Sequence, residues 1–285
     1  MLFVRPPAAA GRFYDLDKDR LKKQLDVAFR RAAEAAKKKK QIGPRKIRGA
    51  VVPHAGYEYS GHVAARFYSL LDDKSPRNYV ILGPNHYAFG QKFATMKNFL
   101  WKTPLGGVAV HEAMVESRMR RCELLQIDVI PHQNEHSIEV QLPFLQARFG
   151  DDFKFVPIAV AADPGDPDAL RGFRELGEAI AGAIKASKDE WAVIASSDFS
   201  HYVPQDEAEA TDGALIKAIV KMDENLFFDR ITQTAATVCG PGPIVSAIVA
   251  AKKLGATKAE LLKYATSGDV TNDYGSVVGY ASIVF

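Results

Sequence analysis

Three segments of the 285-residue sequence end an apolar run with an imidazole or a carboxylate. VVPHAGY places His54 after one such run, and VILGPNH places Asn85 and His86 after another. AVIASSDFSH places Asp198 and His201 after a third. Imidazoles and carboxylates bind transition metals and transfer protons. None of these residues lies in a close-spaced pair such as HExxH, so a shared site depends on a fold that brings the segments together.

Two further segments carry groups that could join such a site. TVCGPGPI places Cys239 just before a predicted helix, and a helix N-terminus favours the thiolate form of a cysteine. PHQNEHSIEVQLPF carries Glu135 and His136 at another helix start. There they either line the cleft or form a capping arrangement at the helix N-terminus. His132, in the same segment, is open between a structural and a functional role.

These residues also have structural interpretations. A single histidine after a strand is most often a hydrogen-bonded loop residue, Asp198 could cap a turn, and Cys239 could be a small buried hydrophobe. His62 and His111 are interpreted as structural. The repeated layout of a strand followed by polar residues favours a functional interpretation of the strand-end groups, because independent accidents rarely meet at one sheet edge. Ligands in open α/β sheets collect beyond the carboxyl ends of the strands.

The elements that must position these groups are predicted from hydrophobic periodicity. Strands are predicted at residues 49–53, 79–83, 153–160, 191–196, 261–266 and 276–285. Helices are predicted at residues 17–40, 61–71, 111–121, 137–149, 168–187, 206–221, 224–237 and 243–254. This alternation predicts an α/β sandwich with a mostly parallel, mixed central sheet flanked by helices. The last strand is expected to pair antiparallel at an edge. No composition shift marks a boundary, so residues 1–285 are predicted to form a single domain.

The composition limits the classes of function. The chain has 37 basic and 34 acidic residues and a net charge of +3, which gives no polyanion-binding signature, so no nucleic-acid partner is expected. The basic run at residues 37–40 is interpreted as a solvated helix end. Two cysteines favour a reducing compartment over a disulfide framework. No signal peptide or membrane-spanning run is recognised, so a soluble cytoplasmic protein is expected.

Six strings together resemble the Memo family, which is named after a human mediator of receptor-driven cell motility. They are AGRFY (10–14), PHAGYEYSG (53–61), LGPNH (82–86), NEHSIEVQLPFLQ (134–146), SSDFSHY (196–202) and CGPGPI (239–244). The match runs in order through nearly the whole chain. The resemblance implies the fold of class III extradiol ring-cleaving dioxygenases, a central mixed sheet flanked by helices. Those dioxygenases hold non-haem iron with two histidines and one carboxylate, and use a further histidine as acid/base.

Carried over by motif, the resemblance implies a metal site. His54 and His86 match the two histidine ligands, and Cys239 falls where the carboxylate ligand would be. His201 matches the acid/base histidine, with Asp198 beside it. Memo proteins bind iron or copper through the corresponding residues, which implies an iron or copper ion and a redox or metal-handling role. Prokaryotic members often neighbour genes for a radical-SAM enzyme, which implies a shared pathway.

The resemblance also implies a ligand pocket that binds phosphotyrosine peptides in the human member. Phe13, Tyr59 and His201 match that pocket, and Asn85 and His136 are added here as candidate ligand-binding residues. Two departures bear on function. A cysteine in place of the carboxylate argues against ring cleavage, because a thiolate is itself oxidisable. Residues 241–242 are Pro-Gly where family members carry a basic pair, which argues against phosphotyrosine binding.

Three functions therefore compete. The first is a metal-dependent redox or metal-handling protein with an unidentified small-molecule ligand. The second is a peptide- or anion-binding module that uses the same cleft without catalysis. The third is a metal-free cysteine hydrolase with Cys239 as nucleophile, His201 as base and Asp198 as the orienting group.

Overall fold

The computed structural model describes residues 2–37, 46–117, 122–161 and 165–285. Its main sheet runs in the order β10-β12-β2-β9-β3-β8-β4-β7, and β11 pairs with β12. The centre consists of four parallel strands, β2 (Gly49–Val52), β9 (Trp191–Ser196), β3 (Asn78–Pro84) and β8 (Lys154–Val160). These strands are buried almost throughout, as successive apolar residues predict for strands covered on both faces. The predicted mixed α/β sheet is confirmed.

The flanks of the sheet are mostly antiparallel. The flanking strands are β10 (His201–Val203), β11 (Glu260–Thr266), β12 (Val277–Val284), β4 (Phe93–Thr95) and β7 (Leu125–Ile127). β12 pairs antiparallel with β2, as expected for the C-terminal run. It does not lie at the outermost edge, because β10 and β11 both pair with it antiparallel. On the opposite flank β4 pairs antiparallel with β8 and parallel with β7.

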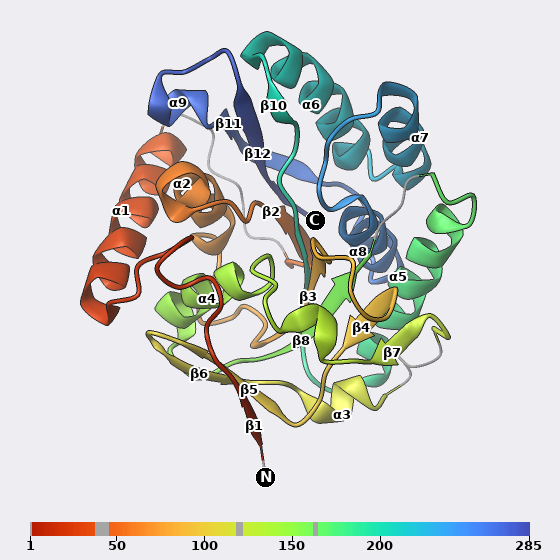
Figure 1. Ribbon diagram of the computed structural model, residues 1–285. Helices are drawn as coiled ribbons and strands as arrows, with labels where there is room; N and C mark the ends of the chain where they lie inside the picture. The colour runs from red at the N-terminus through yellow and green to blue at the C-terminus, as the bar shows by residue number, and fades with distance from the viewer. Residues whose placement is uncertain (1, 38–45, 118–121, 162–164) are drawn as a thin grey trace.

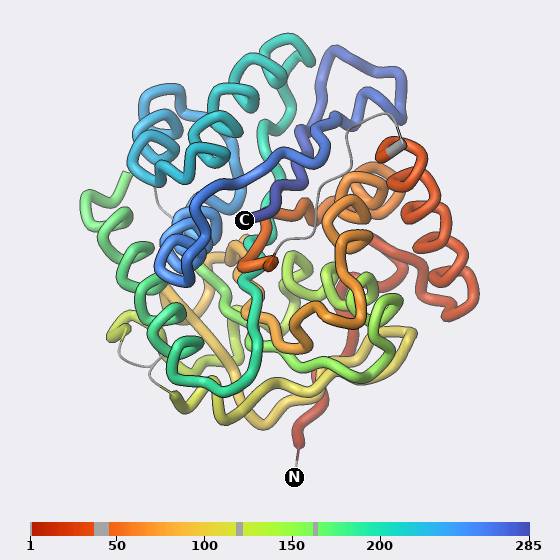
Figure 2. Tube along the Cα trace, turned by 180° about the vertical axis from the view of Figure 1, so that it is seen from behind, coloured from red at the N-terminus to blue at the C-terminus, as the bar shows by residue number. Residues whose placement is uncertain are grey.

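Helices cover both faces of the sheet. They are α1 (Lys18–Lys37), α2 (Tyr57–Tyr68), α3 (Glu112–Val115), α4 (Leu142–Phe149), α5 (Ala169–Ala186), α6 (Gln205–Val220), α7 (Glu224–Thr234), α8 (Pro241–Lys253) and α9 (Gly268–Thr271), with 3-10 turns η2 (Ile130–His132) and η3 (Glu139–Gln141). Figure 1 shows α1, α2 and α4 on one side and α5, α7 and α8 on the other. The view from behind in Figure 2 shows the same two layers. The largest hydrophobic cluster among the described residues draws on both layers.

A second, smaller sheet was not predicted. It consists of β1 (Phe3–Arg5), β5 (Phe99–Thr103) and β6 (Gly106–Ala109), in the order β1-β5-β6. β1 pairs parallel with β5, and β5 and β6 form an antiparallel hairpin. These strands are short and partly exposed, so they lack the buried apolar runs by which the central strands are recognised.

Some predicted helix bounds differ from the structure. The helix predicted at 111–121 is only the single turn α3, after which the Ser117 hydroxyl donates to the Met114 carbonyl and competes with helix propagation. Residues 118–121 lie outside the described residues. Of the basic run at residues 37–40, the structure describes only Lys37, which is the last residue of α1. No helix in the described part of the chain is long and apolar enough to cross a membrane. The assignment of residues 1–285 to one domain stays a prediction.

Candidate metal centre

The parallel strands deliver polar groups to one end of the sheet. His54, His86 and Asp198 each lie two residues beyond the end of their strand (54 after 52, 86 after 84, 198 after 196). Because β2, β9 and β3 are parallel neighbours, these three ends meet at the same edge. The fold thus brings together the strand ends that the sequence predicts to lie at one edge of the sheet.

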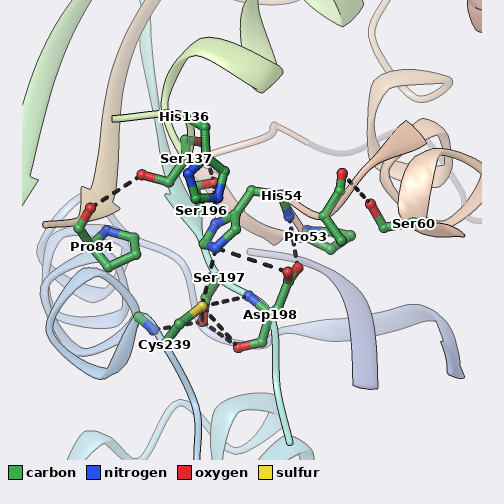
Figure 3. A network of polar contacts seen from close by, with 12 residues as sticks. Pro53, His54, Ser60, Pro84, His136, Ser137, Ser196, Ser197, Asp198 and Cys239 are labelled. Atoms are coloured by element: carbon green, nitrogen blue, oxygen red, sulfur yellow. Dashed lines mark hydrogen bonds and ion pairs between the residues drawn. The ribbon is translucent and has the colours of Figure 1, made fainter. Parts of the chain in front are cut away.

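Three histidines converge at this edge. His54, His86 and His136 each offer a ligand atom, and these atoms lie within 4.8 Å of one another. The His86 and His136 rings are stacked with centroids 4.7 Å apart, and His54 meets both edge-on at 5.2 and 5.3 Å. Figure 3 shows the His54 ring between the His136 ring and the Cys239 sulfur. The sequence left His136 open between the cleft and a cap, and the structure places its ring against His54 and His86.

The His54 ring is oriented by a buried hydroxyl. The Ser196 hydroxyl donates to the Ser137 carbonyl at 2.6 Å and accepts from the Gln141 side-chain amide at 2.8 Å. Its only proton is thus used, so it accepts from His54 Nδ1, which lies 3.0 Å away. A proton on Nδ1 leaves the lone pair on Nε2. A ring nitrogen with an available lone pair, such as this Nε2, can bind a metal.

The other two rings face one buried carboxylate. Glu135 is fully buried, and its Oε1 lies 2.9 Å from His86 Nδ1 and 3.3 Å from His136 Nδ1. Its Oε2 accepts from the His86 backbone N–H at 2.9 Å. Burial by itself would raise the pKa of Glu135, but the hydrogen bond with His86 and the neighbouring imidazoles lower it overall. The sequence named Glu135 only as a cleft or capping residue, and its contact with the two imidazoles was not predicted, because spacing does not show which side chains a loop carboxylate meets.

Cys239 lies beside His54. Its Sγ is 3.1 Å from His54 Nε2 and accepts from the Asp198 backbone N–H at 3.1 Å. Burial, followed by the charge of Asp198, raises the pKa of the Cys239 thiol. The three residues whose ligand atoms lie within 4.8 Å of one another include His136 and do not include Cys239. The expectation that Cys239 is a metal ligand stays a prediction, as does the pairing of His54 and His86 with it.

Asp198 and His201 have different hydrogen-bond partners. Asp198 is buried and accepts the His54 backbone N–H through Oδ1 at 2.8 Å, and burial raises its pKa. His201 is only partly buried, and its Nδ1 lies 2.8 Å from the Thr237 carbonyl. That carbonyl can only accept, so Nδ1 carries the proton and Nε2 stays available. The catalytic roles predicted for Asp198 and His201 stay predictions.

The candidate ligand-binding residues lie around the histidines. The Phe13 ring stacks on His136 with centroids 4.1 Å apart. Phe13 and Tyr59 also line an adjoining cavity of 340 Å³. The Asn85 side chain donates to the Phe89 carbonyl at 2.8 Å, while its buried Oδ1 has no partner among the described residues. Phe13 thus forms an aromatic wall beside His136, and the buried Asn85 Oδ1 is a hydrogen-bond acceptor without a partner among the described residues.

Burial keeps two of the three imidazoles neutral. Burial, followed by the charge of His86, lowers the pKa of His54 well below its ordinary value. Burial, followed by the charge of His54, lowers the pKa of His136 to about 3. A neutral imidazole is the form that binds a metal, so this environment favours coordination over protonation.

Comparison with known proteins identifies the family. The family model described as Memo-like protein matches residues 5–284. A MEMO1 family protein from Methanopyrus kandleri is 44% identical over 99% of this chain and 98% of its own length. Another from Methanothermobacter thermautotrophicus is 41% identical over 98% and 99%, and one from Nitrosopumilus maritimus is 37% identical over 99% of both chains. The family model and these relatives all cover nearly the whole chain, which therefore belongs to the Memo family.

Proposed function

We propose that this protein binds an iron or copper ion through His54, His86 and His136 and has a redox or metal-handling role. The convergence of three imidazoles within 4.8 Å supports the proposal. Imidazole ligands suit iron, copper and zinc, and three protein ligands leave positions open for a small-molecule ligand. The choice of a redox metal comes from the family resemblance. The bound ion would supply one-electron chemistry.

The surrounding residues support this function by their own contacts. Ser196 orients His54, and Glu135 faces the other two rings. Outer partners of this kind are a common feature of histidine metal sites. The Nε2 of His201 carries a lone pair and the residue is half-exposed, so it can pass protons between the cleft and solvent. Cys239 contacts His54 and can add a softer ligand.

Metal analysis of anaerobically purified protein tests the proposal. We expect about one iron or copper ion per chain. His136→Gln should lower the affinity for that ion at least about tenfold, because a ligand is removed. His111→Gln is the matched control, because His111 lies at the start of α3, outside the three-histidine group. Wild-type protein that binds neither metal, or equal affinity in both variants, would contradict it.

A second candidate is a peptide- or anion-binding module without catalysis. The stacking of Phe13 on His136 and the vacant Asn85 acceptor favour an aromatic ligand with a hydrogen-bond donor. Titration of metal-stripped protein with phosphotyrosine separates the two. Binding that is unchanged by metal removal and lost in Phe13→Ala would support the module, and no binding would count against it.

The cysteine hydrolase is the least supported function. The raised pKa of the Cys239 thiol disfavours the nucleophilic thiolate. The imidazole beside the thiol is that of His54, not that of His201. Labelling of Cys239 by a thiol reagent tests this function, and a reaction as slow as that of a buried inert thiol would rule it out.

A further inference from the structure

The segment before α4 carries two fully buried glutamates with different partners. Glu139 binds the N-terminal segment, because its carboxylate accepts from Arg5, from the Tyr14 hydroxyl and from two backbone N–H groups. Glu135 lies four residues earlier and faces the three-histidine group instead. The two carboxylates are therefore a natural pair for comparison, since they share burial and chemistry and differ in what they contact.

The partners of Glu135 are nearly all donors from the metal centre. Its Oε2 takes the His86 backbone N–H, and its Oε1 lies 2.9 Å from the His86 ring nitrogen Nδ1. The same Oε1 lies 3.3 Å from His136 Nδ1 and accepts from the Ser137 backbone N–H at 2.9 Å. An ionised carboxylate can only accept hydrogen bonds, so the His86 Nδ1 that is hydrogen-bonded to it must carry the proton. His136 Nδ1 approaches the same oxygen at ion-pair distance without a hydrogen bond, and there the negative charge of the carboxylate favours a proton on that nitrogen.

We propose that Glu135 is a positioning residue that fixes the Nδ1–H tautomer of His86 by a hydrogen bond and favours the same tautomer in His136 by its negative charge. Their Nε2 lone pairs are thereby left available to one ion, which rests on the metal-binding function proposed above. Ser196 sets the same tautomer in His54 independently. One carboxylate thus orients two of the three donors. Without it, each ring could carry its proton on Nε2, where it would block a metal bond.

A purely structural role for Glu135 makes a different prediction. Its main-chain carbonyl accepts from Arg5 at 2.7 Å, and that contact anchors the loop whichever side chain stands at position 135. If the side chain served only the loop, its replacement would change stability and leave the ring protons in place. The tautomer of the two imidazoles is therefore the readout that separates the two roles.

The first test is long-range ¹⁵N–¹H NMR of the histidine rings in metal-free protein, at about pH 8.5, where an ordinary imidazole is neutral. We expect the wild type to show Nδ1–H for His86 and His136. Glu135→Ala should give both rings a substantial Nε2–H population, and Glu135→Leu, closer in volume, serves if the alanine variant does not fold. Nε2–H rings in the wild type, or unchanged tautomers in the variant, would overturn the assignment.

The second test is a metal titration of Glu135→Gln, which keeps the side-chain volume but loses the charge and one acceptor oxygen. We expect its affinity for iron or copper to fall about 10- to 100-fold, the usual effect of losing an outer partner. Glu139→Gln is the matched control. It should lower the melting temperature and leave the metal affinity within about twofold, because Glu139 contacts none of the three histidines. Equal affinity losses in both variants would overturn the assignment.

The two tests also separate this inference from the function on which it rests. If the wild type binds no metal but shows the expected tautomers, the metal function fails and the positioning role of Glu135 stands. If the wild type binds metal but its rings carry Nε2–H, the positioning role fails and the metal function stands.

Discussion

His132 shows how burial of one residue makes stability depend on pH. It is fully buried, its Nε2 lies 3.1 Å from the Ala94 carbonyl, and its Nδ1 has no partner among the described residues. Burial, followed by the charge of Arg5, lowers its pKa from 6.5 to about 4. Between these values the unfolded chain binds a proton that the folded chain does not. Stability therefore falls as the pH drops through this window.

We expect this one residue to account for about 3 kcal/mol of the stability lost between pH 6.5 and pH 4. His132→Phe keeps an aromatic ring and removes the titration. Urea unfolding across this range should show a shallower pH dependence for the variant than for the wild type, whatever their difference at pH 7. Parallel stability curves would show that folding does not shift the pKa of His132.

At the residue scale, the sequence predicted which strand ends converge better than it predicted the contacts of their side chains. His54 and His86 were predictable because each follows a buried apolar run, and parallel strands bring such ends together. Glu135 and Ser196 were not assigned, because a hydrogen bond between distant segments depends on side-chain directions that spacing does not encode. The same limit applies to His136, whose segment forms 3-10 turns and not one continuous helix.

At the element scale, helices α5 and α8 pack against each other. α8, which begins two residues after Cys239, also packs against the central strands of the sheet. The close approach of the two helices depends on Gly177, where a Cβ would lie 2.5 Å from the Ser246 carbonyl oxygen and 2.8 Å from Val249 Cβ. Gly177→Ala should therefore destabilise the protein by about 1–3 kcal/mol through overpacking. Thermal or urea unfolding measures the loss.

Gly182, on the same helix, provides the control. A Cβ there meets nothing within 4 Å, so Gly182→Ala should stabilise by about 0.5–1 kcal/mol through helix propensity alone. Destabilisation of similar size in both variants would mean that contact with α8 is not the cause.

Element prediction succeeded where the pattern was long and buried. All six predicted strands overlap observed ones, and the helix predicted at 168–187 is observed as α5 (Ala169–Ala186). Six observed strands were missed. β1, β4, β7 and β10 have three residues each, too few to show a period, and β5 and β6 have only five and four and are partly exposed. They form because neighbouring strands offer hydrogen-bonding partners, which is a tertiary effect.

At the scale of the whole molecule, one arginine joins the small sheet to the loop that faces the three histidines. Arg5 ends β1, is 3% exposed and lies 3.9 Å above the Trp101 ring. Its guanidinium donates to the His132 and Glu135 carbonyls at 2.7 Å each and pairs with Glu139. Three donors directed at separate acceptors suit the planar fork of arginine. The N-terminal segment that carries Phe13 over His136 is thereby fixed to the loop that carries Glu135.

This junction predicts a large loss of stability from a single substitution. Arg5→Met keeps the apolar contact with Trp101 but leaves the Glu139 carboxylate buried without its cation, so unfolding free energy should fall by about 3–5 kcal/mol. Arg20→Met is the control, because the Arg20 side chain is 69% exposed in its pair with Asp15 and should contribute less than about 1 kcal/mol. If urea unfolding gave similar small losses for both, Arg5 would not stabilise the junction between the small sheet and the loop that carries Glu135. A large loss confined to Arg5→Met would show that the buried pair with Glu139, and not a positive charge in general, contributes to the stability of the fold.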